Sequence, residues 1–388
     1  MEAVNICAYA RTPIGKFRGS LSKYSATELG AMTVKELLRR AKINPDEGFI
    51  DQLYMGQVLQ AGAGQSPSRQ VALGSGMPYQ TPCTTINKVC GSSLKAVMIG
   101  ASDIRAKVAN LIIAGGMESM SNAPYFIRNP IKGQEINFSD LEWILSYDGL
   151  RDAYSGEMMG ETGETVARDF NISREESDAY AVRSHMLANR GWEKDWLSEE
   201  SFKIGDLEKD EGVRIDTNLD KMKSLKTIFD KNGQVTAGNA SQLSDGASAV
   251  LIASDYAVKR HNLPILAKII DYCTSGLEPS KVMSAPITAI EILLHRNDLT
   301  IDDIDIIEHN EAFASASCSI QKALNIPDEK FNPHGGAVAI GHPLGATGTR
   351  CLMTLVNALN RTSGKFGIVT ICLGGGNAVA MLIEAKII

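Results

Sequence analysis

Two cysteines and one histidine, far apart in the chain, occupy positions that favour cysteine chemistry. Cys90 lies in segment 85–94, which reads as the end of a strand, a tight turn and the start of a helix. A helix N-terminus stabilises the thiolate, the nucleophilic form of cysteine, and so lowers the thiol pKa. Gly91 would let a substrate approach the backbone closely. Most free cysteines are instead small buried hydrophobes, and this segment alone leaves that alternative open.

The histidine and the second cysteine lie near the C-terminus, each beside glycines. His342 is in the glycine-rich segment 335–348, which precedes a helix, and Cys372 ends a strand just before Gly374. Imidazole is the natural base for a thiol because its pKa lies near neutrality. Alternatively, His342 is a structural hydrogen-bonding residue and Cys372 an inert core cysteine. If the three residues meet, they supply a nucleophile, a base and a second thiol.

The composition excludes several classes of function. The chain has 388 residues and a formal charge of −6, which argues against the basic surface that binds nucleic acids or anionic membranes. Seven scattered cysteines without a C-x-x-C pair are typical of reduced thiols, and six histidines without clustered spacing argue against a metal site. The sequence has neither a signal-peptide pattern nor an apolar run of ~20 residues. We therefore expect a cytoplasmic protein without a nucleic-acid or membrane partner.

The elements that must position these residues alternate between strands and helices. This alternation is typical of a parallel sheet covered by helices, an α/β fold. Thr27 is the expected N-cap of the first helix, which ends near residue 44. The other elements expected before residue 119 are strands at 4–8, 52–55, 83–86 and 111–114, and helices at 66–75 and 92–106.

The pattern changes from residue 120 to residue 244. This stretch is polar, contains all three tryptophans and has weak strand signals, so we predict an inserted domain. Within it, Ser173 and Glu176 form a capping box before a helix that reaches about residue 189. The α/β pattern resumes with a buried strand at 247–253. The predicted units are an N-terminal α/β half (1–119 with 245–264), an inserted loop domain (120–244) and a C-terminal α/β half (265–388).

The C-terminal half repeats the order of the N-terminal half. Segment 34–53 aligns with 289–307 across a two-residue gap, which places Gly56 opposite Asn310. The Cys90 turn then corresponds to the His342 loop. Any two α/β segments share some of this spacing, but here the order of the glycine-rich turns matches as well. An internal duplication predicts two similar halves whose loops converge on one cleft.

Four short motifs resemble the catalytic blocks of the thiolases, in the same order and across essentially the whole chain. Thiolases condense an acyl-CoA with acetyl-CoA or run the cleavage in reverse. The resemblance implies the thiolase fold, in which two duplicated βαβαβ-type halves pack as α-β-α-β-α layers with an inserted loop domain. It also implies coenzyme A and acetyl-CoA as substrates, with no tightly bound cofactor. The motifs lie at 89–92, 310–313, 335–345 and 372–376.

The resemblance assigns a role to each residue of these blocks. Cys90 carries the acyl group as a thioester, which keeps the acyl carbon activated. His342 is the base, and Cys372 moves the α-proton of acetyl-CoA. One oxyanion hole is implied at the backbone N–H groups of Cys90 and Gly374. A second is implied at His342 and a water held by Asn310, and the loss of one such donor typically costs ~10²–10³ in rate.

Contacts to coenzyme A are implied mainly on the inserted domain. The departure from the family is Met158, where short-chain biosynthetic thiolases commonly carry histidine. Methionine cannot donate that hydrogen bond, and its flexible apolar side chain could line a pocket for longer acyl chains. The expected activity is acetyl-CoA C-acetyltransferase, and the alternative is a longer-chain 3-ketoacyl-CoA thiolase. The implied contacts are Leu150, Met159, Arg214, Ala237, Ser241 and Leu243, with Phe313 lining the tunnel of the pantetheine arm.

Two other functions fit parts of the pattern. A decarboxylating ketoacyl synthase shares the fold and the cysteine nucleophile, but it uses malonyl thioesters and usually pairs its cysteine with two histidines or a histidine and an asparagine. A non-catalytic CoA-binding or scaffold subunit would not need all four blocks filled. The resemblance also implies a homodimer or homotetramer in which strands near 81–87 pair between subunits.

Overall fold

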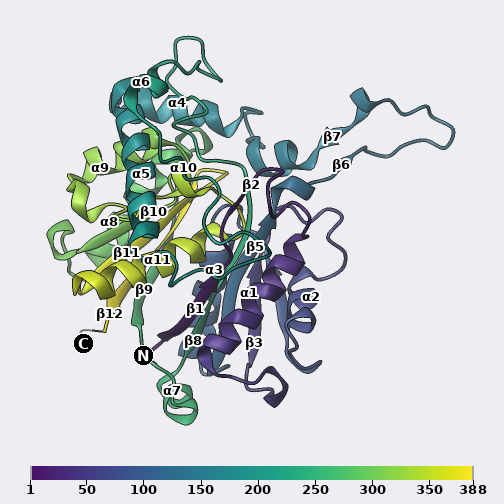
Figure 1. The fold of residues 1–388 in the computed structure, drawn as a ribbon, viewed down its shortest axis with the longest axis vertical. Helices are drawn as coiled ribbons and strands as arrows, with labels where there is room; N and C mark the ends of the chain where they lie inside the picture. The colour runs from purple at the N-terminus through teal and green to yellow at the C-terminus, as the bar shows by residue number, and fades with distance from the viewer. Residues whose placement is uncertain (1, 387–388) are drawn as a thin grey trace.

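The structure of this chain is a computed structural model that describes residues 2–386. Within those residues, the strands form one ten-stranded sheet and a separate two-stranded ribbon (Figure 1). The sheet contains β1 (Asn5–Arg11), β2 (Gly15–Lys16), β3 (Gln52–Gly56), β4 (Cys83–Ile86), β5 (Leu111–Ser119), β8 (Ser244–Ala253), β9 (Ala267–Gly276), β10 (Ile306–His309), β11 (Phe366–Leu373) and β12 (Asn377–Ala385). The ribbon contains β6 (Tyr125–Phe126) and β7 (Glu142–Trp143).

Capping residues set where the helices begin. Ser25 caps the first helix, since its Oγ accepts from the Glu28 N–H (3.2 Å) and Glu28 accepts from the Ser25 N–H (2.8 Å). The expected cap at Thr27 is therefore wrong, whereas Ser173 and Glu176 form the expected capping box.

The α-helices of the described residues are α1 (Ala26–Ala41), α2 (Pro67–Gly74), α3 (Ser92–Arg105), α4 (Met159–Phe170), α5 (Arg174–Glu193), α6 (Leu219–Lys223), α7 (Asp255–His261), α8 (Ala285–Arg296), α9 (Ala314–Leu324), α10 (Ala337–Ile340) and α11 (Thr347–Thr362).

The strand order shows the internal duplication. The sheet runs β10-β11-β12-β9-β1-β8-β5-β3-β4, and β1 and β9 join its two halves through only two residue pairs. In the N-terminal half β3 is parallel to β4 and β5, and β8 is antiparallel to β5. In the C-terminal half β10 is parallel to β11, and β12 is antiparallel to β11. Phe331 forms a parallel bridge with Ile307 of β10. In the C-terminal half this bridge occupies the position that the β3–β4 pair has in the N-terminal half.

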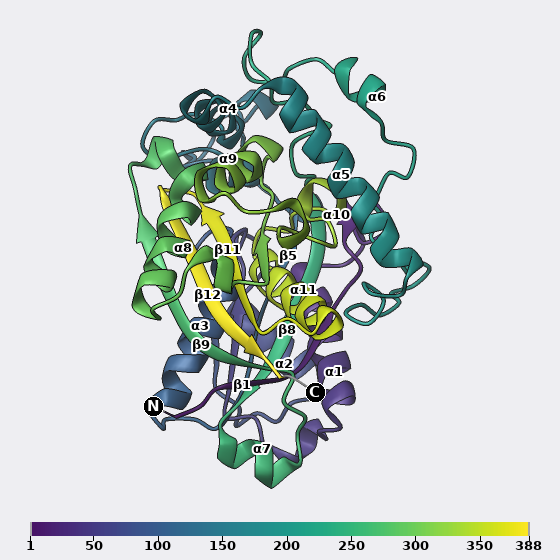
Figure 2. The same cartoon turned by 90° about the vertical axis from the view of Figure 1, so that its left-hand side faces the viewer.

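The two halves pack as layers around a shared pair of helices. Helices α3 and α11 contact each other and lie between the two parts of the sheet. A buried apolar cluster joins both helices to strands of both halves. Helices α1 and α2 cover the outer face of the N-terminal strands, and α8 covers the outer face of β11 and β12 (Figure 2). The predicted thiolase-like α/β architecture is therefore confirmed.

Residues 120–243 connect β5 to β8 and lie mostly outside the main sheet, which they join at the bridge between Ser201 and Arg11 of β1. Their two strands, β6 and β7, pair only with each other, and in Figure 1 this ribbon projects away from the body, while α4, α5 and α6 lie at the top. The exact boundaries of the three units stay a prediction. Among the described residues, none of the helices has the length and apolarity needed to cross a membrane.

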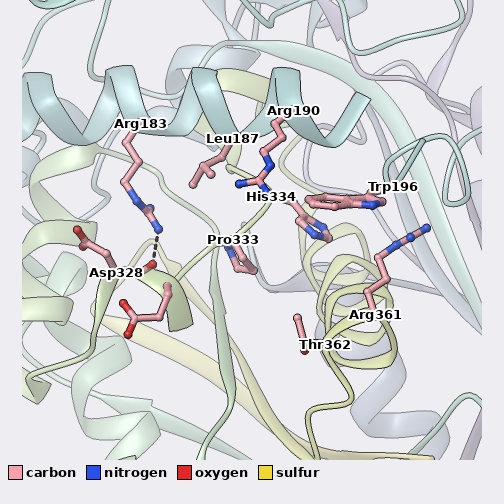
Figure 3. Close-up of a pocket in the computed structure, with 10 residues that line it drawn as sticks. Arg183, Leu187, Arg190, Trp196, Asp328, Pro333, His334, Arg361 and Thr362 are labelled. Carbon is pink, nitrogen blue, oxygen red and sulfur yellow. Dashed lines mark hydrogen bonds between the residues drawn. The ribbon is translucent and has the colours of Figure 1, made fainter. Parts of the chain in front are cut away.

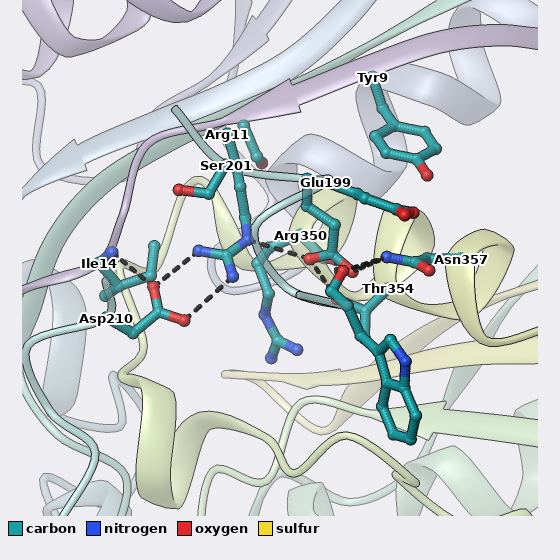
Figure 4. A network of polar contacts seen from close by, with 12 residues as sticks. Tyr9, Arg11, Ile14, Glu199, Ser201, Asp210, Arg350, Thr354 and Asn357 are labelled. Atoms are coloured by element: carbon teal, nitrogen blue, oxygen red, sulfur yellow. Dashed lines mark hydrogen bonds and ion pairs between the residues drawn. The ribbon is translucent and has the colours of Figure 1, made fainter. Parts of the chain in front are cut away.

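A buried ion-pair network fastens the inserted segment to both halves (Figure 4). The Arg11 guanidinium on β1 has no exposed surface and donates to Asp210 (2.7 and 3.0 Å) and Glu200 (3.0 Å). Glu200 also accepts from Thr354 (3.0 Å) and Asn357 (3.3 Å), both on α11. The inserted segment is thus held against β1 and α11, the helix that follows the His342 loop.

Candidate active site

Cys90 lies in a strained turn between β4 and α3. Val89, the residue before it, has a φ of 47°, a left-handed conformation that is rare for a β-branched side chain. The turn is held by Asn87, whose Oδ1 accepts from the Val89 N–H (3.0 Å), and by Ser92, whose Oγ donates to the Val89 carbonyl (2.6 Å). The sequence prediction of a strand, a turn and a helix around Cys90 is confirmed.

Two glycines let the duplicated halves approach each other at this turn. A Cβ on Gly91 would lie 2.5 Å from Leu373 Cδ2, and one on Gly348 would lie 2.6 Å from the Leu94 nitrogen. The expectation that Gly91 makes room for a substrate is therefore corrected: it makes room for β11. Because both glycines lack a side chain, Cys90, His342 and Cys372 come within reach of a common space.

That space is a buried chamber of about 50 Å³. Its walls come from the Cys90 turn, the His342 loop, the end of β11 and the inserted segment. The chamber thus brings together the catalytic residues expected from both halves of the chain. The predicted site residues that line it are Cys90, His342, Cys372, Gly374, Leu150, Met159, Ser241 and Phe313.

The Cys90 thiol is neutral in this environment. Burial raises its pKa, and the nearby Cys372 and Glu118 act in the same direction. The backbone N–H groups of Cys90 and Gly374 act in the opposite direction and lower the pKa, but burial outweighs them. The expected lowering of the thiol pKa is therefore wrong. The two residues predicted to supply the oxyanion-hole donors, Cys90 and Gly374, both line the chamber.

His342 is held as a neutral base by Thr347. Its Nδ1 lies 2.7 Å from Thr347 Oγ1, and that hydroxyl donates its single proton to the Pro343 carbonyl (2.9 Å). Nδ1 must therefore carry the imidazole proton, which leaves Nε2 as an acceptor. Nε2 is buried and has no hydrogen-bond partner within residues 2–386. Burial, and the charge of Arg350, lower the His342 pKa to about 3, not the near-neutral value expected.

Asn310 follows β10 and binds Cys372 on the adjacent strand. Its Oδ1 accepts from the Cys372 N–H (3.2 Å) and from the Cys372 thiol (3.4 Å). Burial raises the pKa of Cys372 to about 11, against the opposing effect of this hydrogen bond. Asn310 Nδ2 is buried and, in the described part of the chain, has no partner. Asn310 can therefore orient Cys372 and also donate to a water or a substrate oxygen.

A larger channel adjoins the chamber and shares Leu150, Met159, Ser241, Phe313, His342 and Leu344 with it. The channel has a volume of about 440 Å³ and adds the predicted contacts Ala237 and Leu243. Met158 lines this channel and is absent from the chamber wall. A wider acyl pocket at Met158 is therefore not supported. Arg214 lies on the surface outside both spaces, with its N–H bonded to His185 (3.1 Å).

Several residues of the site were not expected from the sequence. Val282 and Met283 line the chamber from the turn before α8, and Gly149 lines it from a π-helical turn, Leu145–Leu150. Glu118 accepts from the backbone N–H groups of residues 58, 59 and 345 at 2.9–3.1 Å, and burial raises its pKa to about 7. In the sequence, Glu118 was marked only as part of the GMES segment, which ends β5 and after which the pattern changes. Nothing in the sequence marked Met283.

A second hollow lies away from both cysteines (Figure 3). It has a volume of about 480 Å³, and its lining residues all differ from those of the chamber and the channel. The His334 ring packs at a tilt against Trp196 with ring centroids 5.0 Å apart, and Arg190 and Arg361 lie over the Trp196 ring. Burial and these two arginines lower the His334 pKa to about 4, so this histidine is a neutral structural residue. Residues 2–386 contain no group of three metal-binding side chains.

Two thiols and a neutral imidazole on one chamber, built from duplicated α/β halves, define an enzyme that carries an acyl group on cysteine. The chain belongs to the thiolase family, since the thiolase N-terminal domain profile matches residues 4–256 and the C-terminal domain profile residues 263–385.

The chain also resembles curated thiolases along its whole length. It is 42% identical to an acetyl-CoA acetyltransferase of Cupriavidus necator, over 100% of both chains. It is 40% identical to an acetyl-CoA acetyltransferase of Pseudomonas aeruginosa, over 98% of this chain and 99% of the relative. It is 38% identical to a probable acetyl-CoA acyltransferase of Staphylococcus aureus, over 99% of each.

Proposed function

We propose that this protein is an acetyl-CoA C-acetyltransferase, which joins two acetyl-CoA molecules into acetoacetyl-CoA or cleaves the product. The observation that carries the proposal is that Cys90, His342 and Cys372 line one buried chamber. The names of the relatives support acetyl transfer. Coenzyme A is a substrate in this proposal, and we expect no tightly bound cofactor.

The first half of the reaction loads Cys90. The Cys90 proton passes to Nε2 of His342, and the thiolate attacks the carbonyl carbon of acetyl-CoA. Cys90 and Gly374 both line the chamber, and in this proposal their backbone N–H groups stabilise the oxyanion that forms. The carbon–sulfur bond to coenzyme A breaks, and the imidazolium returns its proton to the leaving thiolate. Acetyl-Cys90 and free coenzyme A result.

The second half forms the carbon–carbon bond. Cys372 first passes its own proton to His342 and then takes an α-proton from a second acetyl-CoA. Asn310 Nδ2 and the protonated His342 stabilise the enolate oxygen, directly or through water. The enolate carbon attacks acetyl-Cys90, and Cys90 leaves as a thiolate that recovers the proton from His342. Acetoacetyl-CoA is released and all three side chains regain their starting state.

The pantetheine arm has a matching space in the channel. The walls of the channel include Leu150, Met159, Ala237, Leu243 and Phe313, which we propose contact the arm. Arg214 stays a proposed contact to the phosphorylated adenosine, which would lie outside the channel at the surface.

Covalent labelling tests the proposal. Wild-type protein incubated with radiolabelled acetyl-CoA should retain one acetyl group, and Cys90→Ala should retain none. Cys273→Ala is the matched control, because Cys273 is buried away from the chamber. Label that persists on Cys90→Ala, or coenzyme A binding without any labelling or thiolysis in the wild type, would contradict the proposal.

A comparison of substrates separates condensation from the decarboxylating alternative. We expect turnover with acetyl-CoA alone, because Cys372 supplies the base that an unactivated acetyl group needs. A strict requirement for malonyl-CoA would indicate a ketoacyl synthase instead.

The assembly that we propose is a homodimer or homotetramer. Strand β4 ends the sheet order, so its outer edge is open to a second strand, and its residues are mostly half-buried. Light scattering of the purified protein would show a dimer or tetramer if β4 pairs between subunits, and a monomer would contradict this assembly.

A further inference from the structure

Glu311, the residue after Asn310, has a strained backbone. Its φ is 55°, a left-handed conformation that is uncommon for residues other than glycine, and the residue is fully buried. Val89 is strained in the same way beside Cys90. Strain of this kind persists only where the surrounding structure holds the residue in place, and it clusters at functional sites. The contacts that hold Glu311 therefore bear on how Asn310 is oriented.

The Glu311 carboxylate accepts four hydrogen bonds within the described chain. Its Oε1 accepts from the Tyr180 hydroxyl (2.9 Å) and from Asn332 Nδ2 (2.8 Å). Its Oε2 accepts from the Ser184 hydroxyl (2.7 Å) and from the Val338 N–H (3.2 Å). Four donors match a carboxylate, which accepts at both oxygens and donates at neither. Two of the donors come from α5, so this carboxylate ties the inserted segment to the end of β10.

The same contacts fix the residue before Asn310. The Asn332 side chain accepts from the His309 N–H (2.7 Å) and donates to the His309 carbonyl (3.0 Å), as a neighbouring strand would. The Glu311 N–H donates to His309 Nδ1 (3.3 Å). Asn310 thus lies between two residues that side chains hold in place, and its own side chain binds Cys372.

His342 is held by other contacts. Its N–H donates to the Gln242 carbonyl (3.0 Å) and lies 3.2 Å from Ser244 Oγ, and its Nδ1 donates to Thr347. None of these three partners is among the four donors to Glu311. The base of the first half-reaction is therefore positioned independently of the Glu311 carboxylate.

We propose that Glu311 is a positioning residue, whose buried carboxylate fixes the backbone turn that directs the Asn310 side chain at Cys372. Glu311 does not line the chamber and acts on the reaction through Asn310. This inference rests on the proposed function, in which Asn310 orients Cys372 and stabilises the enolate in the second half-reaction. Loss of the Glu311 contacts should therefore slow carbon–carbon bond formation and leave acetylation of Cys90 nearly unchanged.

Glu311→Gln tests the inference, because glutamine has nearly the same shape as glutamate. Its amide oxygen can accept from one pair of donors, but its amide nitrogen meets the other pair as a further donor. We expect formation of acetoacetyl-CoA from acetyl-CoA to fall by ~10²-fold, the typical cost of a small misplacement in an active site. Exchange of the acetyl α-protons with deuterated water, which reports enolate formation, should fall as well. Rapid-quench labelling of Cys90 by radiolabelled acetyl-CoA should stay within a few-fold of the wild type.

Tyr180→Phe is a milder variant that removes one of the four donors. Oε1 still accepts from Asn332, so condensation should fall by only about 2- to 10-fold, in line with the loss of one hydrogen bond. Glu164→Gln is the matched control, because Glu164 is a buried carboxylate that lines neither the chamber nor the channel. It accepts from the backbone of residues 234 and 235 at 2.8–3.0 Å, and its substitution should leave the ratio of the two half-reaction rates unchanged.

A double variant shows whether Glu311 acts through Asn310. Asn310→Ala should itself slow condensation. Adding Glu311→Gln should cost little more, because the side chain that Glu311 positions is already absent. Independent effects of the two substitutions would multiply instead.

The outcomes distinguish the two levels of the proposal. Equal loss in both half-reactions, no loss in either, or multiplied losses in the double variant overturn the role of Glu311 and leave the proposed function standing. If Glu311→Gln does not fold, the same outcomes are measured with Tyr180→Phe. A wild type that neither acetylates Cys90 nor forms acetoacetyl-CoA overturns the proposed function, and the inference with it.

Discussion

His342 Nδ1 lies 2.7 Å from Thr347 Oγ1, and this contact decides which imidazole nitrogen faces the chamber. The Thr347 hydroxyl donates to the Pro343 carbonyl, so it can only accept from His342. Nε2 is left without a proton, and in the proposed mechanism it is the base that accepts the Cys90 proton. Thr347, the first residue of α11, thus acts through His342 as a positioning residue.

Thr347→Val should therefore slow catalysis without preventing folding. The variant keeps the shape of the side chain but loses the acceptor, so Nδ1–H is left unsatisfied and the other tautomer gains population. We expect kcat to fall by about 10- to 100-fold, part of the ~10²–10⁴ that a positioned base contributes, with KM nearly unchanged. Steady-state thiolysis of acetoacetyl-CoA measures both constants. Thr347→Ser keeps the hydroxyl and should recover most of the rate, and equal losses in both variants would argue against a tautomer effect.

Cys372→Ala should divide the reaction into its two halves. Cys90 and His342 remain in place, so the enzyme should still acquire an acetyl group from acetyl-CoA. Carbon–carbon bond formation should fall by at least ~10³-fold, because the base for the α-proton is lost. Rapid-quench labelling follows the first half, and formation of acetoacetyl-CoA follows the second. Equal loss of both halves would contradict the division of labour between the thiols.

The sequence predicted the parts of this site that depend on local pattern. The bounds of β4 and the turn at Cys90 follow from a short β-branched run and small residues, and the duplication placed His342 opposite Cys90. The cap at Thr27 was wrong because Ser25, three residues before Glu28, satisfies the capping box better.

The remaining features depend on contacts between distant segments. Met283 reaches Cys372 because β9 pairs with β12 and the Leu277 N–H binds the Gly376 carbonyl, about 100 residues farther along the chain. The pKa values of Cys90 and His342 are set by the burial of their side chains between the two halves. A helix N-terminus, which lowers a thiol pKa, can be predicted from the sequence. The burial that raises the Cys90 pKa by more than this depends on the packing of the two halves, which only the structure gives.

His334 should make the protein less stable in mild acid. Its pKa is about 4 in the folded chain and about 6.5 when unfolded, so between these values the unfolded state binds more protons. Stability contributed by the neutral ring is complete above pH 6.5 and is lost as the pH falls toward 4. From pH 7 to pH 5 the wild type should lose about 2 kcal/mol more than His334→Gln, which cannot be protonated. Urea unfolding at both pH values measures this difference.

A second variant tests the cause of the low His334 pKa. Arg190 and Arg361 contribute to the low pKa of His334, and Arg190→Ala should therefore reduce the loss of stability in acid. If the free energy of unfolding changes equally with pH in the wild type and in His334→Gln, the His334 pKa is not lowered in the folded chain and the prediction is contradicted.

Arg11→Met should destabilise the protein far more than the loss of an exposed ion pair would. The substitution removes the cation between Asp210 and Glu200 and leaves two buried carboxylates without their partner. Breaking a buried pair in this way costs about 3–5 kcal/mol, whereas an exposed pair contributes about 0–1 kcal/mol. Arg39→Met is the matched control, because Arg39 is 73% exposed and pairs with Glu36 on the same helix. Urea unfolding at pH 7 should show a large loss in the free energy of unfolding for Arg11→Met and almost none for Arg39→Met.

The network joins the inserted segment to β1 and α11, so Arg11→Met should also speed hydrogen exchange in residues 200–210. Similar exchange rates in both variants would show that other contacts hold that segment in place.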